Sequence, residues 1–311
     1  SIKSIYGLKP GDKRSGLAEL NSIDTKTLFD LIRSNAPLDK EQIDAVLSHE
    51  TLKRVWFNSL ADSLKPNTSA PQSIKSLNSL RHVLRIHGIE NEYVKILLEI
   101  YASSPELQNY ESFKKLIAMC DPYVFAKNAD DELITNSSDY ILQMSSSPVI
   151  PTYGWHASKE WLLALDKANF AVHKNLIMGL VKKYVDLQIQ SGGLSDSDAL
   201  VSAVGLVYGE AKLALIDLIP TDKLAILIDG LSASSAKNKL SLAKIINRLG
   251  GNLNAILLDV VQYREVNYAI RYLVKLGANN LQEAFNAAKW KKSKNQLAKL
   301  MQRIEAAKKS T

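Results

Sequence analysis

The residues most able to bind another molecule lie near the C-terminal end of the chain. Segment 289–311 contains eight lysine and arginine residues and one acidic residue, Glu305, so its net charge is +7. Basic and acidic residues balance over the other 288 positions, and a field that attracts anions therefore originates in this segment. Lysines surround Trp290, an arrangement suited to phosphate contact with base stacking or to an anionic membrane surface. The sequence predicts an anion- or nucleic-acid-binding site formed by Lys289, Trp290, Lys291, Lys292, Lys294, Lys299 and Arg303.

An aromatic cluster is the second candidate site. Tyr153 and Trp155 follow a stretch rich in serine and proline, and Trp161 comes six residues after Trp155. Because pockets often lie where lobes meet, these three residues are a candidate aromatic ligand site between two lobes. Packing of the tryptophans in the core between the lobes is the simpler explanation. An enzymatic alternative adds Asp166, since helical-repeat DNA glycosylases have an aromatic-lined pocket with an acid, but no motif supports it.

No residue pattern predicts a catalytic, cofactor-binding or metal site. His82 and His87 are five residues apart and fall on different faces of a helix, which does not suit a zinc site. The Gly-x-x-x-x-Gly-Lys-Ser/Thr phosphate loop and the Gly-x-Ser-x-Gly nucleophile turn do not occur. We therefore expect a protein that is not an enzyme and that needs no cofactor.

The composition is that of a globular protein, with 46% hydrophobic and 23% charged residues. No apolar run approaches the roughly 20 residues of a membrane-spanning helix, and residues 1–6 have no apolar leader. The single cysteine, Cys120, excludes an internal disulfide and fits a reducing compartment. These features predict a cytoplasmic location.

Hydrophobic residues recur at helical spacing and no segment alternates as a strand does, so we expect an all-α fold. The chain is expected to begin with an extended arm at 1–23, followed by an N-terminal helical lobe at 24–147 and a C-terminal helical-repeat lobe with a basic end at 153–311. Helices outside the repeat are expected at 25–33, 40–47, 51–64, 73–87, 90–102, 106–119, 121–128, 130–144, 156–169 and 170–190.

The C-terminal third of the chain repeats itself. Segment 242–249 matches segment 297–304, which lies 55 residues later, and segments 212–219 and 269–276 have the same pattern. Glycine and asparagine at 250–252 and 277–280 tolerate the conformation that ends a helix. Because one helical hairpin cannot bury its own apolar face, the pattern predicts an α-solenoid of stacked helix–turn–helix units of about 28 residues.

Segment 272–280, Tyr-Leu-Val-Lys-Leu-Gly-Ala-Asn-Asn, resembles the second helix and the following turn of an ankyrin repeat. The resemblance covers residues 210–305. The family's Thr-Pro-Leu-His opening is absent at 257–259, and the unit is shorter than an ankyrin repeat. A degenerate ankyrin-like array and a generic α-solenoid of the HEAT kind both fit. Either resemblance implies a protein-binding surface and no catalytic residues.

These observations predict a non-enzymatic scaffold or adaptor that holds a partner protein on a concave repeat surface. The alternative is a sequence-tolerant nucleic-acid-binding protein that resembles viral nucleoproteins and holds an RNA backbone between two helical lobes. The basic end also has a structural explanation, because a terminal repeat needs a polar outer face. The salt dependence of nucleic-acid binding distinguishes these interpretations.

Overall fold

The computed structural model describes residues 25–34, 40–62, 121–145 and 157–310, together with Ala36, Leu38, Gly88 and Asn91. Within these residues the protein is all-α, as the sequence predicts, and contains no strand. The chain divides into two compact units between Leu176 and Ile177. The expected arm at 1–23, the expected lobe boundary at 148–152 and the helices expected at 73–87 and 106–119 lie outside the described residues, as does the helix expected at 90–102 except for Asn91.

Most described helices of the first unit agree with those expected from hydrophobic spacing, but the helix expected at 156–169 ends at Ala164. The chain is helical at 25–33, and the pairs Leu28 with Ile32 and Leu52 with Trp56, each four residues apart, are buried. The other helices are α3 (Lys40–Leu47), α4 (Glu50–Asp62), α8 (Pro122–Asn128), α9 (Asp131–Ser145) and α10 (Ala157–Ala164). A long helix, α11 (Phe170–Gly192), crosses the division between the units and is kinked at His173.

Helix α8 positions the aromatic core of the first unit. The Asp121 carboxylate accepts hydrogen bonds from the backbone N–H groups of Tyr123 and Val124, which satisfies donors that the helix start leaves free. The side chain of Phe125, one turn later, is fully buried. It meets Trp161 of α10 edge-to-face, with ring centroids 5.5 Å apart and an interplanar angle of 76°. Such aromatic pairs stabilise a core beyond their buried area.

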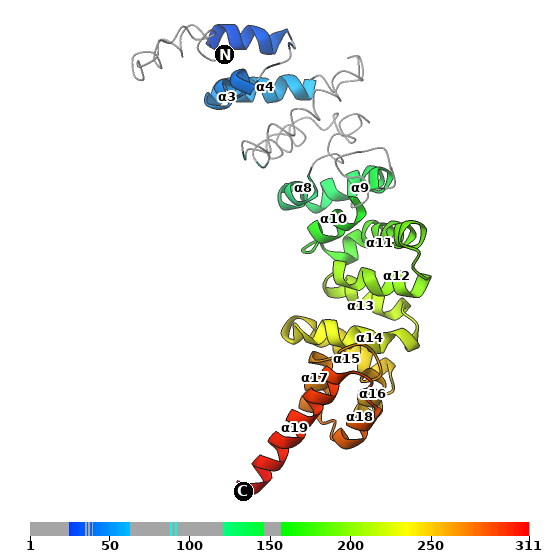
Figure 1. Ribbon diagram of the computed structural model, residues 1–311. Coiled ribbons are helices and arrows are strands. Elements are labelled where there is room, and N and C mark those ends of the chain that lie inside the picture. The colour runs from blue at the N-terminus through cyan, green and yellow to red at the C-terminus, as the bar shows by residue number, and fades with distance from the viewer. Residues whose placement is uncertain are drawn as a thin grey trace. The chain divides into compact units, whose positions relative to one another are not determined.

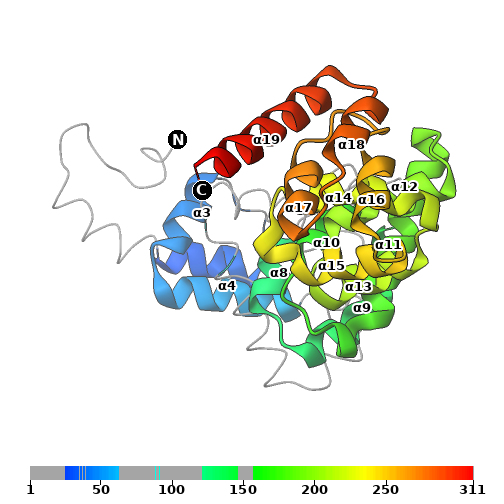
Figure 2. The ribbon, with the colours of Figure 1, turned by 90° about the horizontal axis from the view of Figure 1, so that it is seen from below.

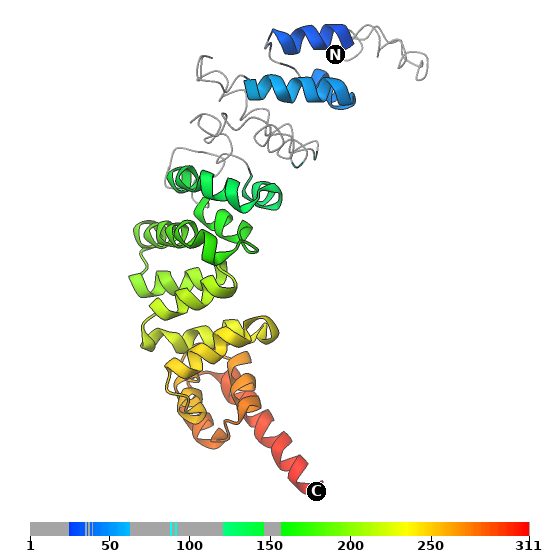
Figure 3. The ribbon, with the colours of Figure 1, turned by 180° about the vertical axis from the view of Figure 1, so that it is seen from behind.

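The second unit consists of short helices that follow one another closely (Figures 1 and 3). In order they are α12 (Asp196–Ala203), the 3₁₀ turn η2 (Val204–Leu206), α13 (Gly209–Leu218), α14 (Thr221–Ser232), α15 (Ser235–Arg248), α16 (Leu253–Val260), α17 (Tyr268–Leu276), α18 (Leu281–Ala287) and α19 (Lys291–Lys309). The sequence predicts Asp196 or Ser197 as the N-cap of α12. The structure instead places Ser195 there, with its hydroxyl oxygen accepting from the N–H of Asp198 at 3.2 Å.

The helices of the second unit pack in two rows. In the first row α14 contacts α12 and α16, and α16 contacts α18. In the second row α13 contacts α15, and α17 contacts α19. The rows are joined where α14 packs on α15 and α17, α16 packs on α17, and α18 packs on α19. Figure 2 shows α17, α18 and α19 together at one end of this unit.

A continuous apolar core lies between the two rows. Each helix from α14 to α19 contributes at least one side chain that is 4% exposed or less. The clearest examples are Leu224, Leu242, Leu257, Leu273, Leu281 and Leu297. Their burial supplies the main driving force for the fold, since a fully buried leucine contributes roughly 1.5–3 kcal/mol.

Three polar side-chain contacts between neighbouring parts of the second row share one spacing in sequence. Lys244 pairs with Asp217, Lys292 pairs with Glu265, and the Ser293 hydroxyl donates to the backbone oxygen of Val266. Each of these bonds joins residues 27 positions apart. The spacing is close to the steps of 29, 27 and 28 residues that lead from Ala214 to Ala243, Ile270 and Ala298 in the repeated segments.

Glycines end the helices α15 and α17, as their positions in the sequence predict. Gly250, Gly251 and Gly277 have φ values of +87°, +71° and +127°, which residues with a side chain rarely adopt. The N–H groups of Gly277 and Ala278 donate to the backbone oxygen of Leu273, so they satisfy a carbonyl that the end of α17 leaves free.

Candidate binding face of the C-terminal unit

Helix α19 is fixed to the unit by its first half only. Leu297 is fully buried, Ser293 is buried beside Val266, and the Lys292 ammonium lies 2.7 Å from the Glu265 carboxylate. From Gln302 to Ser310 every residue is exposed, and Ile304 is 40% exposed. Figures 1 and 3 show the last turns of α19 extending beyond α17 and α18.

The structure separates the seven basic and aromatic residues that the sequence groups into one site. Six of them are exposed, namely Lys289, Trp290, Lys291, Lys292, Lys299 and Arg303. Lys294 is the exception, because it is half-buried with its Nζ 5.7 Å from the centroid of the Phe285 ring. It therefore lies on the side of α19 that packs against α18.

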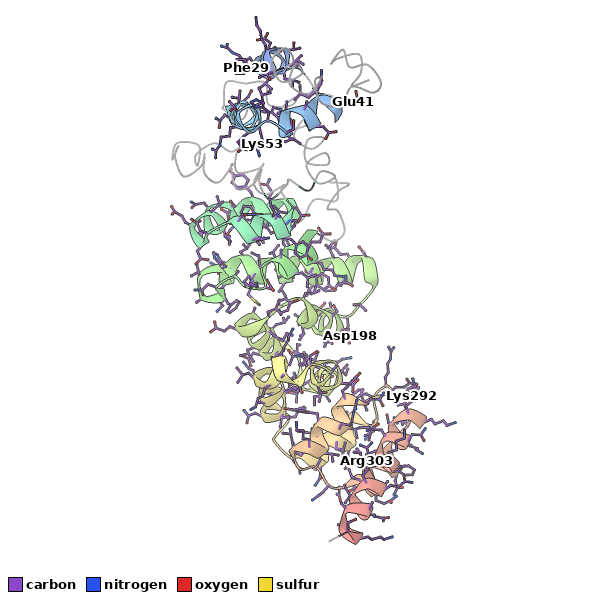
Figure 4. All side chains as sticks on the ribbon, turned by 90° about the vertical axis from the view of Figure 1, so that its left-hand side faces the viewer. Phe29, Glu41, Lys53, Asp198, Lys292 and Arg303 are labelled. Carbon is purple, nitrogen blue, oxygen red and sulfur yellow. The ribbon has the colours of Figure 1, made fainter. Side chains whose placement is uncertain are left out.

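Lys292, Lys299 and Arg303 share one edge of α19. They are separated by seven and four residues, spacings that return to the same side of a helix. Because Lys292 reaches Glu265, which lies just before α17, this edge faces α17. Figure 4 labels Lys292 and Arg303 on α19.

Helix α17 adds two basic residues that the sequence analysis missed. Arg271 and Lys275 are exposed and four residues apart, so they lie on one side of the helix. The Arg271 guanidinium lies over the Tyr268 ring, 4.9 Å from its centroid. Together, Arg271, Lys275, Lys299 and Arg303 form what we call the basic edge. The pattern in the sequence that indicates these two residues is a pair of basic residues at helical spacing in a segment without acidic residues.

The two rows of helices carry charge of opposite sign. This separation is not visible in the charge summed over positions 1–288, which is zero. Helices α12, α14, α16 and α18 of the first row each carry a net negative charge. In the second row α15 has four basic residues and α17 has two, and neither helix contains an acid. The positive field of the C-terminal unit therefore extends beyond α19 to α15 and α17, whereas α13 is the second-row helix without an excess of basic residues.

Large apolar side chains are exposed on every helix of the second row. They are Leu218 on α13, Leu240 on α15, Tyr268 and Leu276 on α17, and Ile304 on α19. Leu240 is 74% exposed and has exposed alanines four residues before it and three residues after it, at Ala236 and Ala243. This spacing places all three on the outward side of α15. We call this set of five large side chains the apolar row.

Burial changes the titration of two side chains near these surfaces. Partial burial raises the pKa of the Tyr272 hydroxyl on α17, so this group stays protonated at neutral pH. Burial lowers the pKa of Lys212, whose ammonium donates to the Asn238 side chain at 3.3 Å.

The aromatic cluster is described only in part. Trp161 is 3% exposed and packs against Phe125, so it belongs to the core of the first unit, together with α8. Asp166, which the enzymatic alternative paired with it, is exposed. Tyr153 and Trp155 lie outside the described residues, as do Cys120, His82 and His87.

Within the described part of the chain, no three His, Cys, Asp or Glu side chains come close enough together to hold a metal ion. The acidic residues at 130–132 act within the first unit: Asp130 accepts from the N–H of Leu133 at the start of α9, and Asp131 lies 2.7 Å from His173. None of the described helices is both long and apolar enough to cross a lipid bilayer.

Comparisons with models of protein families, with curated protein sequences and with solved structures give no significant match to this chain.

Proposed function

We propose that the protein is a non-enzymatic adaptor whose C-terminal helical unit binds a partner protein. The single observation that carries this proposal is the apolar row, because exposed large apolar side chains recur on α13, α15, α17 and α19, all four helices of the second row. Isolated exposed apolar residues are common, but their recurrence across neighbouring elements is typical of protein-binding surfaces.

The polar contacts inside the unit support a structural rather than a catalytic role. The Asp229 carboxylate accepts from three consecutive backbone N–H groups at the start of α17, those of Asn267, Tyr268 and Ala269. Asn254 accepts in the same way from the N–H groups of Asn279 and Asn280. These side chains are occupied in joining neighbouring helices, which is what a stacked helical-repeat scaffold requires of them.

The repeated spacing of these contacts also supports the ankyrin-like or generic α-solenoid assignment, which we retain as part of the proposal. Bonds at intervals of 27 residues join successive helices. In such arrays each unit contacts mainly its neighbours, and the exposed faces of successive helices form one extended binding surface.

The proposal is tested with Leu240→Gln and Leu276→Gln in one chain. Glutamine has a helix propensity close to that of leucine, so both helices should persist while apolar contact area is removed. A photoreactive residue at position 243 is used to crosslink the chain to proteins in extracts of the cells that naturally make it. The most abundant crosslinked protein is then purified, and its binding to the chain is measured by calorimetric titration. We expect the double substitution to weaken its binding at least tenfold.

The matched control is Val172→Gln on α11, because Val172 is 52% exposed and lies outside the apolar row. It should leave the affinity within twofold of the unsubstituted chain. If no purified protein binds, or if the control weakens binding as much as the double substitution does, the adaptor proposal is wrong.

A further inference from the structure

We propose that the basic edge, formed by Arg271, Lys275, Lys299 and Arg303, binds the phosphate backbone of a nucleic acid without sequence preference. This goes beyond the adaptor proposal, because it concerns other residues and another kind of ligand. Helices α15 and α19 match in sequence, but their basic residues differ in the partners they have.

Two basic residues of α15 have structural partners that account for them. Lys244 pairs with Asp217 of α13. Arg248 donates from Nη1 to the backbone oxygens of Ile216 and Ile219, at 2.7 and 2.8 Å, and so satisfies carbonyls at the end of α13. A repeat of this kind therefore uses a lysine and an arginine to fasten one helix to its neighbour.

The matching residues of α19 are Lys299 and Arg303, which come 55 positions after Lys244 and Arg248. Lys244 pairs with the residue 27 positions earlier, and the residue 27 positions before Lys299 is Tyr272, so Lys299 has no carboxylate to pair with there. Near the end of α17, the oxygens of Leu273 and Val274 already accept from backbone N–H groups in the following turn. Both basic side chains are thus exposed without the structural role that the repeat otherwise gives them.

Helix α17, which contacts α19, carries two more exposed cations. Arg271 and Lys275 are one turn apart, as are Lys299 and Arg303, and one turn of helix is about 5.4 Å. Packed helices are separated by roughly 8–10 Å, and α17 contacts α19 directly. The result is two neighbouring rows of positive charge that a chain of phosphates could follow.

The uniform sign of the charge favours a nucleic acid over an acidic protein. Helix α17 contains no acid, and Glu305 lies on the side of α19 away from Lys299 and Arg303 by its helical position. A nucleic acid carries one charge at every phosphate, and cations released from those phosphates drive its binding to lysine and arginine.

The test is a fluorescence polarisation titration of the full chain with a labelled 20-nucleotide single-stranded RNA and with a DNA of the same sequence. Contacts with about four phosphates give a slope of log K against log salt near −3 for a single strand. We therefore expect roughly a 50-fold loss of affinity between 50 and 200 mM salt, with similar affinity for both probes.

The decisive variant combines Lys275→Gln, Lys299→Gln and Arg303→Gln. Its matched control, Lys167→Gln with Lys174→Gln and Lys182→Gln, removes three charges from exposed positions away from the basic edge. We expect the first variant to bind RNA at least tenfold more weakly with a salt slope about two units smaller, and the control to change affinity less than threefold.

Three results would overturn the proposal. The first is no binding of either probe at 50 mM salt, and the second is an equal loss of RNA affinity in the two triple variants. The third is that poly-glutamate or phosphatidylserine vesicles bind through the basic edge whereas RNA does not bind. Leu240→Gln should leave RNA binding unchanged, so the outcome is independent of the adaptor proposal. Circular dichroism of each variant confirms that the helices are retained.

Discussion

Arg248, the last residue of α15, donates a hydrogen bond at 2.8 Å to the backbone oxygen of Ile219, which lies 29 residues earlier. A second bond at 2.7 Å reaches the oxygen of Ile216. Backbone oxygens at the end of a helix have no partner inside it, and a cation there also interacts favourably with the helix dipole. The Arg248 side chain thereby joins α15 to α13, the preceding helix of the second row.

We expect Arg248→Met to lower the free energy of unfolding by about 1–3 kcal/mol, because the variant leaves the Ile219 oxygen without this donor and leaves the Ile216 oxygen with the N–H of Ile219 alone. Urea denaturation followed by circular dichroism measures the change. Lys239→Met, at an exposed position of the same helix, is the control and should change stability by less than about 0.5 kcal/mol. Equal effects of the two substitutions would show that the carbonyl bonds contribute nothing.

Asp229→Ala should destabilise the unit by about 1–2 kcal/mol. The Asp229 carboxylate accepts from the N–H groups of Asn267, Tyr268 and Ala269 at 2.9 to 3.0 Å, so it caps a helix from another element of the fold. Asp259, at the matching position of α16, is exposed. Asp259→Ala is therefore the control, and an equal loss of stability in both variants would contradict the capping role.

The stability difference between the unsubstituted chain and Asp198→Asn should depend on pH. The hydrogen bond from Lys223, followed by that from Ser195, lowers the pKa of Asp198 below its ordinary value of 3.8. A carboxyl group whose pKa is lower in the folded state contributes stability above the unfolded pKa, and this contribution is lost as pH falls through the folded pKa.

Melting temperatures of both proteins are measured between pH 7 and pH 2.5. We expect the unsubstituted chain to melt higher at pH 7 and the gap to close below pH 3.8, where Asp198 becomes protonated in the unfolded and then in the folded state. A gap that stays constant over this range would mean that the ion pair with Lys223, at 3.0 Å, makes no difference to stability. Figure 4 labels Asp198 at the start of α12.

Trp161→Ala should lower the stability of the first unit by about 3–5 kcal/mol, as expected when a large buried aromatic side chain is removed. Trp161 is 3% exposed against Phe125, so the cavity would lie inside a packed core. Trp290→Ala, at a position 42% exposed, should cost much less. Unfolding of each variant is followed by the change in tryptophan fluorescence, and the part of that change that a variant no longer shows is the contribution of the tryptophan it lacks. Comparable losses of stability in the two variants would contradict the core position of Trp161.

Within the described residues, the sequence by itself determined most of the helices, because helix formation depends largely on local spacing. The pairs Leu28 with Ile32 and Leu52 with Trp56 recur at helical intervals, and Gly250 and Gly277 end their helices where only glycine is readily accommodated. The match between segments 242–249 and 297–304 likewise predicted helices of the same kind, and α15 and α19 cover those segments.

Only the tertiary structure decided which basic residues are available to bind a ligand. Lys244 and Lys299 occupy matching positions in the sequence, yet only Lys244 has a carboxylate within reach, because Asp217 and Tyr272 differ on the neighbouring helix. Likewise, Arg271 and Lys275 lie outside segment 289–311, and the tertiary structure packs their helix, α17, against α19. Such pairings depend on contacts between segments about 27 residues apart, which local spacing does not specify.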